Sequence, residues 1–233
     1  MTTVFCFPHA GGGALAFLGW KHPADRLQVA PVVLPGREAH RDRPMPPSMP
    51  LVVDHVIDVL GPRLVGDFAF FGHSFGAGVA YALTRKLYEL GAPMPRLLAV
   101  SGRRAPHRAP SWPSVHTASD EVFIDYLVGL GGIPHEVIRN PALLATFLPI
   151  LRADFAVHET YDAPLKPLLP LAVSAFVGAQ DPAVSVADVL AWRDITGHSF
   201  RARAFPGGHF YHREHSAAIL EAIYDDMEGQ ARR

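Results

Sequence analysis

The chain has 233 residues, a length typical of one domain. Hydrophobic residues make up 49% of it and charged residues 18%, which supports a sizeable core and excludes a disordered chain. The 21 Lys and Arg residues nearly balance the 22 Asp and Glu residues, and the formal net charge of −1 argues against a nucleic-acid-binding protein. The single cysteine, Cys6, excludes an intrachain disulfide and a four-cysteine zinc site.

The first residues do not have the pattern of a targeting peptide. Met1–Thr3 carries no basic side chain, and the apolar run Val4–Phe7 is too short for a signal sequence. The longest other apolar stretch, Leu168–Ala179, falls short of the roughly 18 residues that a membrane span needs. We therefore expect a soluble cytoplasmic protein that does not associate with membranes.

Short apolar runs alternate along the chain with amphipathic stretches of helical length. The predicted strands are Val4–Phe7, Gln28–Leu34, Phe68–Phe71, Leu97–Val100, Leu171–Val177 and Phe200–Phe205. The predicted helices between them are Leu51–Leu64, Gly76–Leu90, Val186–Thr196 and Glu214–Glu228. Strands that are apolar throughout suit a sheet covered on both faces, so the alternation predicts an α/β fold with a parallel sheet. The partly alternating last run predicts an edge strand.

Residues 115–162 interrupt this alternation, because they contain no strand pattern. Two helices are predicted there, Glu121–Leu130 and Pro141–His158, with a glycine-rich segment between them. Helices inserted between consecutive strands often form a lid over the functional edge of a sheet. We expect one domain, residues 1–233, with a lid of about residues 115–162.

Ser74 lies at the centre of a Gly-x-Ser-x-Gly motif, Gly72–Gly76. The motif alone is weak evidence, but here a predicted strand precedes it and a predicted helix follows it. Small residues two positions on either side of the serine permit a tight strand-to-helix turn that presents the hydroxyl group above the sheet. Ser74 is therefore the candidate nucleophile, and the alternative is an ordinary glycine-rich turn.

A candidate acid and a candidate base follow later strands, in the order Ser, acid, His that serine hydrolases of α/β fold use. Asp181 follows the fifth predicted strand, and His209 follows the sixth in a glycine-rich loop. Asp181 precedes Pro182 and could instead be a turn residue, and His209 taken alone could be an ordinary loop histidine. Asp154 is a rival acid in the predicted lid, and Asp188 is assigned to the helix after Asp181.

The glycine-rich loop Pro8–Gly13 follows the first predicted strand and resembles the histidine–glycine loops of esterases. We expect the backbone N–H groups of Ala10 and Phe75 to form an oxyanion hole beside Ser74. A glycine run after a strand can also hold a phosphate group, but the chain lacks a Gly-x-x-x-x-Gly-Lys-[Ser/Thr] motif.

Thirteen histidines are the one anomaly of the composition. His209, His212 and His215 are spaced three apart, but neither His-Glu-x-x-His nor His-x-x-Glu-His occurs in the chain. We expect no metal site, and we interpret His212 and His215 as solvated residues of a helix. Cys6 is interpreted as a small buried hydrophobic side chain without a role in the reaction.

Five sequence blocks occur in an order that is far more specific than the serine motif. They are Phe7–Gly12, Leu34–Glu38, Phe71–Ala77, Ser101–Pro106 and Pro206–Phe210. Together they resemble the type II (editing) thioesterases of polyketide and nonribosomal peptide assembly lines, over nearly the whole chain. The resemblance implies an α/β-hydrolase fold with a helical lid, and a triad of Ser74, Asp181 and His209.

The resemblance also implies the reaction. Type II thioesterases hydrolyse acyl groups from the phosphopantetheine arm of acyl or peptidyl carrier proteins. We therefore expect a monomeric serine thioesterase that needs no cofactor and whose partner is a carrier protein domain. The alternatives are a carboxylesterase or lipase that acts on small oxygen esters, and a non-catalytic binding protein on a hydrolase scaffold.

Two groups of residues are expected to surround Ser74. Arginines that follow the ends of predicted strands predict a basic rim for the phosphopantetheine phosphate or an acidic carrier protein, with solvated loop arginines as the alternative. They are Arg37, Arg41, Arg43, Arg103, Arg104 and Arg108.

Some apolar lid residues are expected to line an acyl chamber. The candidates are Phe123, Ile124, Leu127, Leu144, Phe147, Leu148, Leu151 and Phe155.

Overall fold

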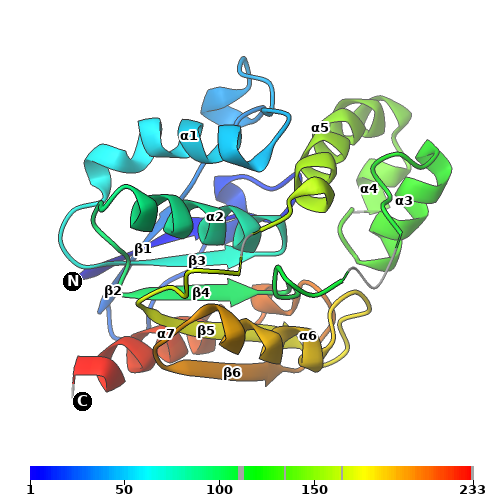
Figure 1. Ribbon diagram of the computed structural model, residues 1–233. Coiled ribbons are helices and arrows are strands. Elements are labelled where there is room, and N and C mark those ends of the chain that lie inside the picture. The colour runs from blue at the N-terminus through cyan, green and yellow to red at the C-terminus, as the bar shows by residue number, and fades with distance from the viewer. Residues whose placement is uncertain (110–112, 134, 164, 232–233) are drawn as a thin grey trace.

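A computed structural model of the chain describes residues 1–109, 113–133, 135–163 and 165–231, and its centre is a six-stranded sheet (Figure 1). The strands are β1 Thr2–Phe7, β2 Leu27–Pro31, β3 Phe68–His73, β4 Leu97–Ser101, β5 Ala172–Gly178 and β6 Phe200–Phe205. They pair in the order β2-β1-β3-β4-β5-β6, and every neighbouring pair is parallel. The parallel sheet and the edge position of β6 confirm the sequence prediction. β2 is shorter than predicted, because its neighbour β1 ends one residue beyond the Cys6–Pro31 pair.

Helices cover both faces of the sheet. The α-helices of the described residues are α1 Met49–Leu60, α2 Phe75–Glu89, α3 Asp120–Gly129, α4 His135–Ile138, α5 Pro141–Thr160, α6 Val186–Leu190 and α7 Ser216–Ala231, of which α1, α2, α6 and α7 pack on the sheet. One apolar core joins α1, α2 and α6 to the sheet, and a second core joins α7 and the loop around Phe17 to the opposite face. Side chains alternate between faces along a strand, so Phe5 belongs to the first core and Cys6 to the second. Cys6 is fully buried, as predicted.

Some predicted helices begin or end at other residues in the structure. The predicted helix Leu51–Leu64 is observed as α1, Met49–Leu60, followed by a 3-10 helix, Gly61–Arg63. The predicted helix Val186–Thr196 divides into α6 and a 3-10 helix, Ala191–Ile195. A 3-10 helix has three residues per turn, so Trp192 and Ile195 lie on the same side, and both are buried in the first core. α7 begins at Ser216, two residues later than predicted.

The helices α3, α4 and α5 come between β4 and β5 and lie beyond the carboxyl ends of the strands (Figure 1). They share a small apolar core of their own, which we call the lid core. Its buried members are Val115, Phe123, Leu127, Ile133, Leu151 and Phe155. The one-turn helix α4 was not predicted from the sequence, because four residues are too few for a helical period to be recognised.

By length and composition alone, α5 is long and apolar enough to cross a membrane, and 17% of its 18-residue apolar stretch is buried. One such helix is weak evidence for a membrane span. Its Asp154 is fully buried and forms an ion pair with Arg37 of the core, so this helix is bound to the rest of the chain through a charged side chain. The absence of membrane association stays a prediction.

Backbones come into direct contact around the Gly72–Gly76 turn. A Cβ atom on Gly76 would lie 2.1 Å from the carbonyl oxygen of Phe7, and one on Gly72 would lie 2.3 Å from the carbonyl oxygen of Gly76. Such distances are shorter than real Cβ atoms adopt, so only glycine fits at either position. The end of β1 is thereby held against the start of α2.

Buried imidazoles lie beneath the carboxyl edge of the sheet. The rings of His73 and His212 have centroids 3.9 Å apart, and both residues are almost fully buried. The Nδ1 atom of His73 lies 2.9 Å from the hydroxyl oxygen of Ser101, which is 2.6 Å from the Tyr211 hydroxyl. The interpretation of His212 as a solvated helix residue is therefore wrong: the turn after His209 directs its ring into the protein.

Removal from water sets the charge state of four imidazoles in this part of the protein, those of His9, His73, His158 and His212. It lowers the pKa of His9 to about 4 and holds the pKa of His73, His158 and His212 well below its usual value. Nearby imidazole and guanidinium groups lower them further. These side chains are therefore neutral in the folded protein at neutral pH.

We expect Gly76→Ala to lower the free energy of unfolding by about 3 kcal/mol, since the new methyl group overlaps backbone atoms that cannot move without separating β1 from α2. Urea denaturation measures the change. Gly61→Ala is the control, because its Cβ atom would lie 4.0 Å from its nearest neighbour, Ile57. Equal stability of the two variants would contradict the steric argument.

Acid should destabilise the fold through the buried imidazoles. Below pH 6.5 the unfolded chain binds protons that the folded protein excludes, because each folded-state pKa is lower than the unfolded one. Each group should remove about 1.4 kcal/mol of stability per pH unit as the pH falls from 6.5 toward its folded pKa. Urea denaturation over this pH range measures the slope. His212→Gln should make it shallower by about 1.4 kcal/mol per pH unit, and an unchanged slope counts against a neutral buried His212.

Candidate active site

Ser74 lies at the point where β3 turns into α2. Its backbone angles, φ 54° and ψ −115°, are in a region that residues with a side chain rarely adopt, and its N–H group donates to the carbonyl oxygen of Ser101 over 2.8 Å. Ser101 ends the neighbouring strand β4, so the sheet itself holds the strained turn. This is the nucleophile-elbow geometry that the motif predicts.

The two backbone N–H groups predicted as oxyanion donors belong to Phe75, which directly follows Ser74, and to Ala10, in the loop after β1. Phe75 is the first residue of α2, whose first N–H groups have no partner inside the helix. Ala10 follows β1, in the loop that the Gly76 contact holds against the elbow. Within the described part of the chain, neither N–H group donates a hydrogen bond to the protein. Both sequence-predicted donors are therefore free to bind a ligand oxygen.

Asp181 and His209 form a buried pair. The Nδ1 atom of His209 lies 2.8 Å from Oδ2 of Asp181, and the two side chains are 5% and 0% exposed. The other carboxylate oxygen accepts the N–H groups of Ala183 and Val184, at 2.9 Å and 3.2 Å. Asp181 therefore has both of the roles that the sequence left open: it is a turn residue before Pro182, and it is the partner of His209. The hydrogen bonds of the turn hold its carboxylate toward the imidazole.

The glycines around this pair let their two loops touch. A Cβ atom on Gly178 would lie 2.2 Å from the carbonyl oxygen of Gly208, so the loop after β5 lies directly on the loop after β6. Ser74 and His209 line the same cavity, of about 70 Å³. No hydrogen bond between them is among the described contacts, and in many hydrolases this bond tightens only when substrate binds.

The rival acids have other partners. Asp154 bonds to Arg37 and to the N–H group of Gly11, and Asp188 forms a capping box with Ser185 at the start of α6. Asp181 is therefore the one of the three that contacts His209. Among the described residues, no group of three or more His, Cys, Asp or Glu side chains is arranged to hold a metal ion.

Two of the arginines predicted to form a basic rim, Arg37 and Arg103, are buried, although Arg103 lines the cavity of Ser74. Arg37 is 7% exposed and is paired with Asp154. Arg103 is also 7% exposed, its guanidinium group contacts His158 and lies over Gly78, and burial lowers its pKa to about 9. The Nε1–H group of Trp192 donates to the Arg103 carbonyl oxygen over 2.8 Å, which ties this loop to the 3-10 helix after α6.

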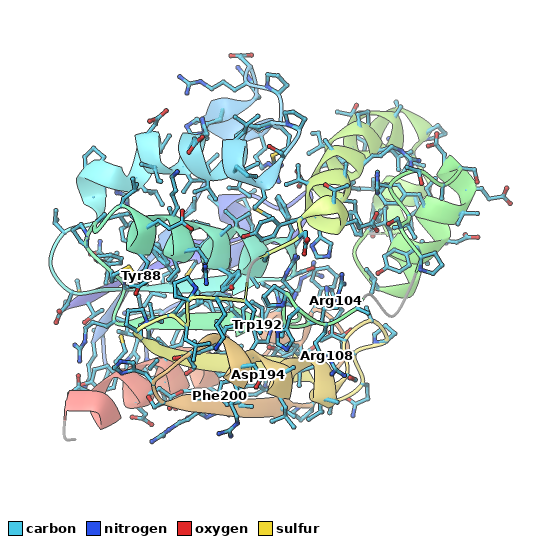
Figure 2. All side chains as sticks on the ribbon, in the orientation of Figure 1. Tyr88, Arg104, Arg108, Trp192, Asp194 and Phe200 are labelled. Atoms are coloured by element: carbon cyan, nitrogen blue, oxygen red, sulfur yellow. The ribbon has the colours of Figure 1, made fainter. Side chains whose placement is uncertain are left out.

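The other four arginines stay near the surface. Arg104 lines the cavity of Ser74 together with Tyr126 and Glu159, at the edge that faces the lid (Figure 2). Arg41, Arg43 and Arg108 are exposed. The sequence alone does not distinguish these four arginines from the buried Arg37 and Arg103, because burial depends on a partner residue that is distant in the sequence.

A second cavity, of about 200 Å³, lies against the loop that follows β1. It is lined by Ala10 and Gly11 of the first loop and by apolar side chains of the lid region, and Arg213 is the charged residue among its lining. The apolar ones are Ile133, Val137, Phe147 and Leu151. Phe147 and Leu151 were among the predicted chamber residues, whereas Leu148 packs against the lid core.

Comparison with known proteins agrees with this geometry. The family model of the thioesterase domain matches residues 2–227. Gramicidin S biosynthesis protein GrsT of Aneurinibacillus migulanus is 35% identical over 221 residues, which cover 94% of this chain and 86% of that protein. The medium-chain S-acyl fatty acid synthase thioesterase of Rattus norvegicus is 35% identical over 214 residues, covering 89% and 80%.

A solved structure gives the same result. The RedJ thioesterase from the prodiginine biosynthetic pathway in Streptomyces coelicolor has a TM-score of 0.88 and 38% identity, over 95% of this chain and 89% of that one. The α/β-hydrolase fold and the resemblance that the sequence suggested are both confirmed. The chain therefore belongs to the thioesterase family, as a thioester hydrolase related to the type II thioesterases of nonribosomal peptide and polyketide pathways.

Proposed function

We propose that Ser74, His209 and Asp181 are the catalytic triad of this hydrolase, and that its substrates are acyl groups on the phosphopantetheine arm of carrier proteins in the cytoplasm. The observation that supports the triad is the buried 2.8 Å contact between His209 and Asp181. The imidazole of His209 lines the same cavity as Ser74, whose backbone is strained. The carrier protein is inferred from the relatives, which belong to pathways that hold intermediates on such proteins.

The proposed reaction uses side chains and backbone alone and needs no cofactor. His209 accepts the hydroxyl proton while Ser74 Oγ attacks the thioester carbonyl carbon, and Asp181 stabilises the imidazolium that forms. The N–H groups of Ala10 and Phe75 stabilise the tetrahedral oxyanion, each by about 3 kcal/mol. His209 then protonates the departing pantetheine sulfur, and a water molecule releases the acyl group from Ser74 by the same route.

The two cavities divide the substrate between them. The thioester sulfur must face His209, because that imidazole protonates it. His209 lines the smaller cavity. The arm therefore leaves through this cavity, where Arg104, Tyr126 and Glu159 offer partners for its amide groups. The acyl group extends the other way, past Ala10 into the larger apolar cavity under the lid.

Ser74→Ala should reduce hydrolysis of an acyl carrier protein thioester by about 10⁴-fold or more while the protein stays folded. Single-turnover release of a radiolabelled acyl group measures the rate, and circular dichroism checks the fold. A fluorophosphonate should label the wild-type protein at Ser74 and leave the variant unlabelled. Turnover by the variant at the wild-type rate would overturn the triad.

Phe147→Ala should shift selectivity toward longer acyl chains. The change removes a large apolar side chain from the larger cavity, and kcat/KM for octanoyl relative to acetyl should rise by about tenfold. Leu148→Ala is the matched control, since it deletes a neighbouring apolar side chain of α5 that packs against the lid core. A chain-length profile that moved equally in both variants would assign the effect to lid stability instead of cavity size.

A further inference from the structure

A carboxylate of the lid reaches the backbone of the oxyanion loop. Asp154 lies in the middle of α5 and is fully buried. Its Oδ2 atom accepts the N–H group of Gly11 over 2.7 Å, and Gly11 directly follows the proposed oxyanion donor Ala10. This is a charge-assisted hydrogen bond to the peptide unit that joins Ala10 and Gly11, and it restrains the orientation of the loop at that point.

Arg37 completes the arrangement from the core side. Its two terminal nitrogens donate to the two carboxylate oxygens of Asp154, at 2.9 Å and 2.6 Å. The first of these nitrogens also donates to the carbonyl oxygen of Gly12 over 3.0 Å, and Nε donates to the carbonyl oxygen of Pro35 over 3.0 Å. Arg37 and Asp154 together thus hold the N–H group of Gly11 and the carbonyl group of Gly12.

The lid helix also presses on the loop sterically. Gly11 has φ +72°, and a Cβ atom there would lie 2.6 Å from Cδ2 of Leu151. Leu151 and Asp154 are three residues apart in α5 and therefore share one face of the helix. The same face supplies a packing contact and a hydrogen bond to a single residue of the loop.

We propose that Asp154 and Arg37 are positioning residues that fix the Ala10 N–H group, so that the oxyanion hole is complete only while α5 is docked on the loop. The inference rests on the proposed function, since it takes Ala10 as an oxyanion donor. An oxyanion donor must lie about 2.7 to 3.1 Å from the oxyanion, a range only about 0.4 Å wide. A loop freed from Asp154 should therefore lose stabilisation of the transition state before it loses binding of the substrate.

A buried ion pair with a purely structural role would predict a different result. Such pairs contribute to stability and need not affect the chemical step. The chain provides a matched control in Asp226, which is 5% exposed and pairs with both terminal nitrogens of Arg203 at 2.6 Å and 2.8 Å. Asp226 lies on α7 and also contacts Ser174 of β5 and Arg201 of β6, none of which belongs to the oxyanion loop.

The experiment compares Asp154→Asn with Asp226→Asn on an acyl-pantetheine thioester. Asp154→Asn should lower kcat about 100-fold and change KM less than about threefold, whereas Asp226→Asn should keep the wild-type kcat. Urea denaturation reports the loss of stability in each variant. A trifluoromethyl ketone analogue, which forms a tetrahedral adduct with Ser74, should lose affinity for Asp154→Asn in proportion to kcat.

A double variant keeps the test decisive if Asp154→Asn folds poorly. Arg37→Met with Asp154→Leu replaces the ion pair by apolar side chains, which should restore stability while kcat stays about 100-fold low, because the Gly11 N–H group has lost its acceptor. A wild-type kcat in this variant, or equal kinetic effects of Asp154→Asn and Asp226→Asn, overturns the positioning role. That outcome is distinct from failure of the triad, which would appear as full activity of Ser74→Ala.

Discussion

The active site depends on backbones that touch where glycine alone leaves room. At Gly76 the start of α2 meets the end of β1, and at Gly178 the loop after β5 meets the loop after β6. The first contact holds the loop that contains Ala10 against the turn of Ser74, and the second brings the loop of Asp181 onto the loop of His209. Four segments far apart in the sequence are thereby placed by contacts between peptide groups, which are stiffer than contacts between flexible side chains. The geometry needed for acyl transfer is in this sense a property of the fold.

The sequence predicted most of this arrangement because each part has a local signature. Every candidate residue of the site follows the carboxyl end of a strand, where a run of apolar residues gives way to glycine or proline. The strands themselves are buried on both faces and are therefore recognisable without their neighbours. The one-turn helix α4 was missed, since four residues are too few to show a helical period. The 3-10 helix that contains Trp192 was predicted as a continuation of the helix before it.

The fate of charged and polar side chains was harder to predict, because it depends on partners distant in the chain. Arg37 resembled the exposed Arg41 in its sequence context, yet it is buried against Asp154, 117 residues away. His212 resembled His215 in the same way, yet it packs on His73 inside the protein. A sequence motif shows which residue type is present at a position. The burial of that residue depends on which distant segments contact it, and only the three-dimensional structure shows those contacts.

The lid helix α5 connects the parts of the site that the core alone leaves separate. Leu151 and Phe147 line the larger cavity, and His158 and Glu159, farther along the same helix, line the smaller one. Between them, Asp154 reaches the oxyanion loop. Because one helix contacts both cavities and the loop, we expect a shift of α5 that admits a bulky acyl group to move Asp154 and the loop it holds as well. With the acyl group in the larger cavity, as proposed, we expect its size and the rate of its hydrolysis to be coupled through α5, so that selection among acyl groups acts on the chemical step as well as on binding.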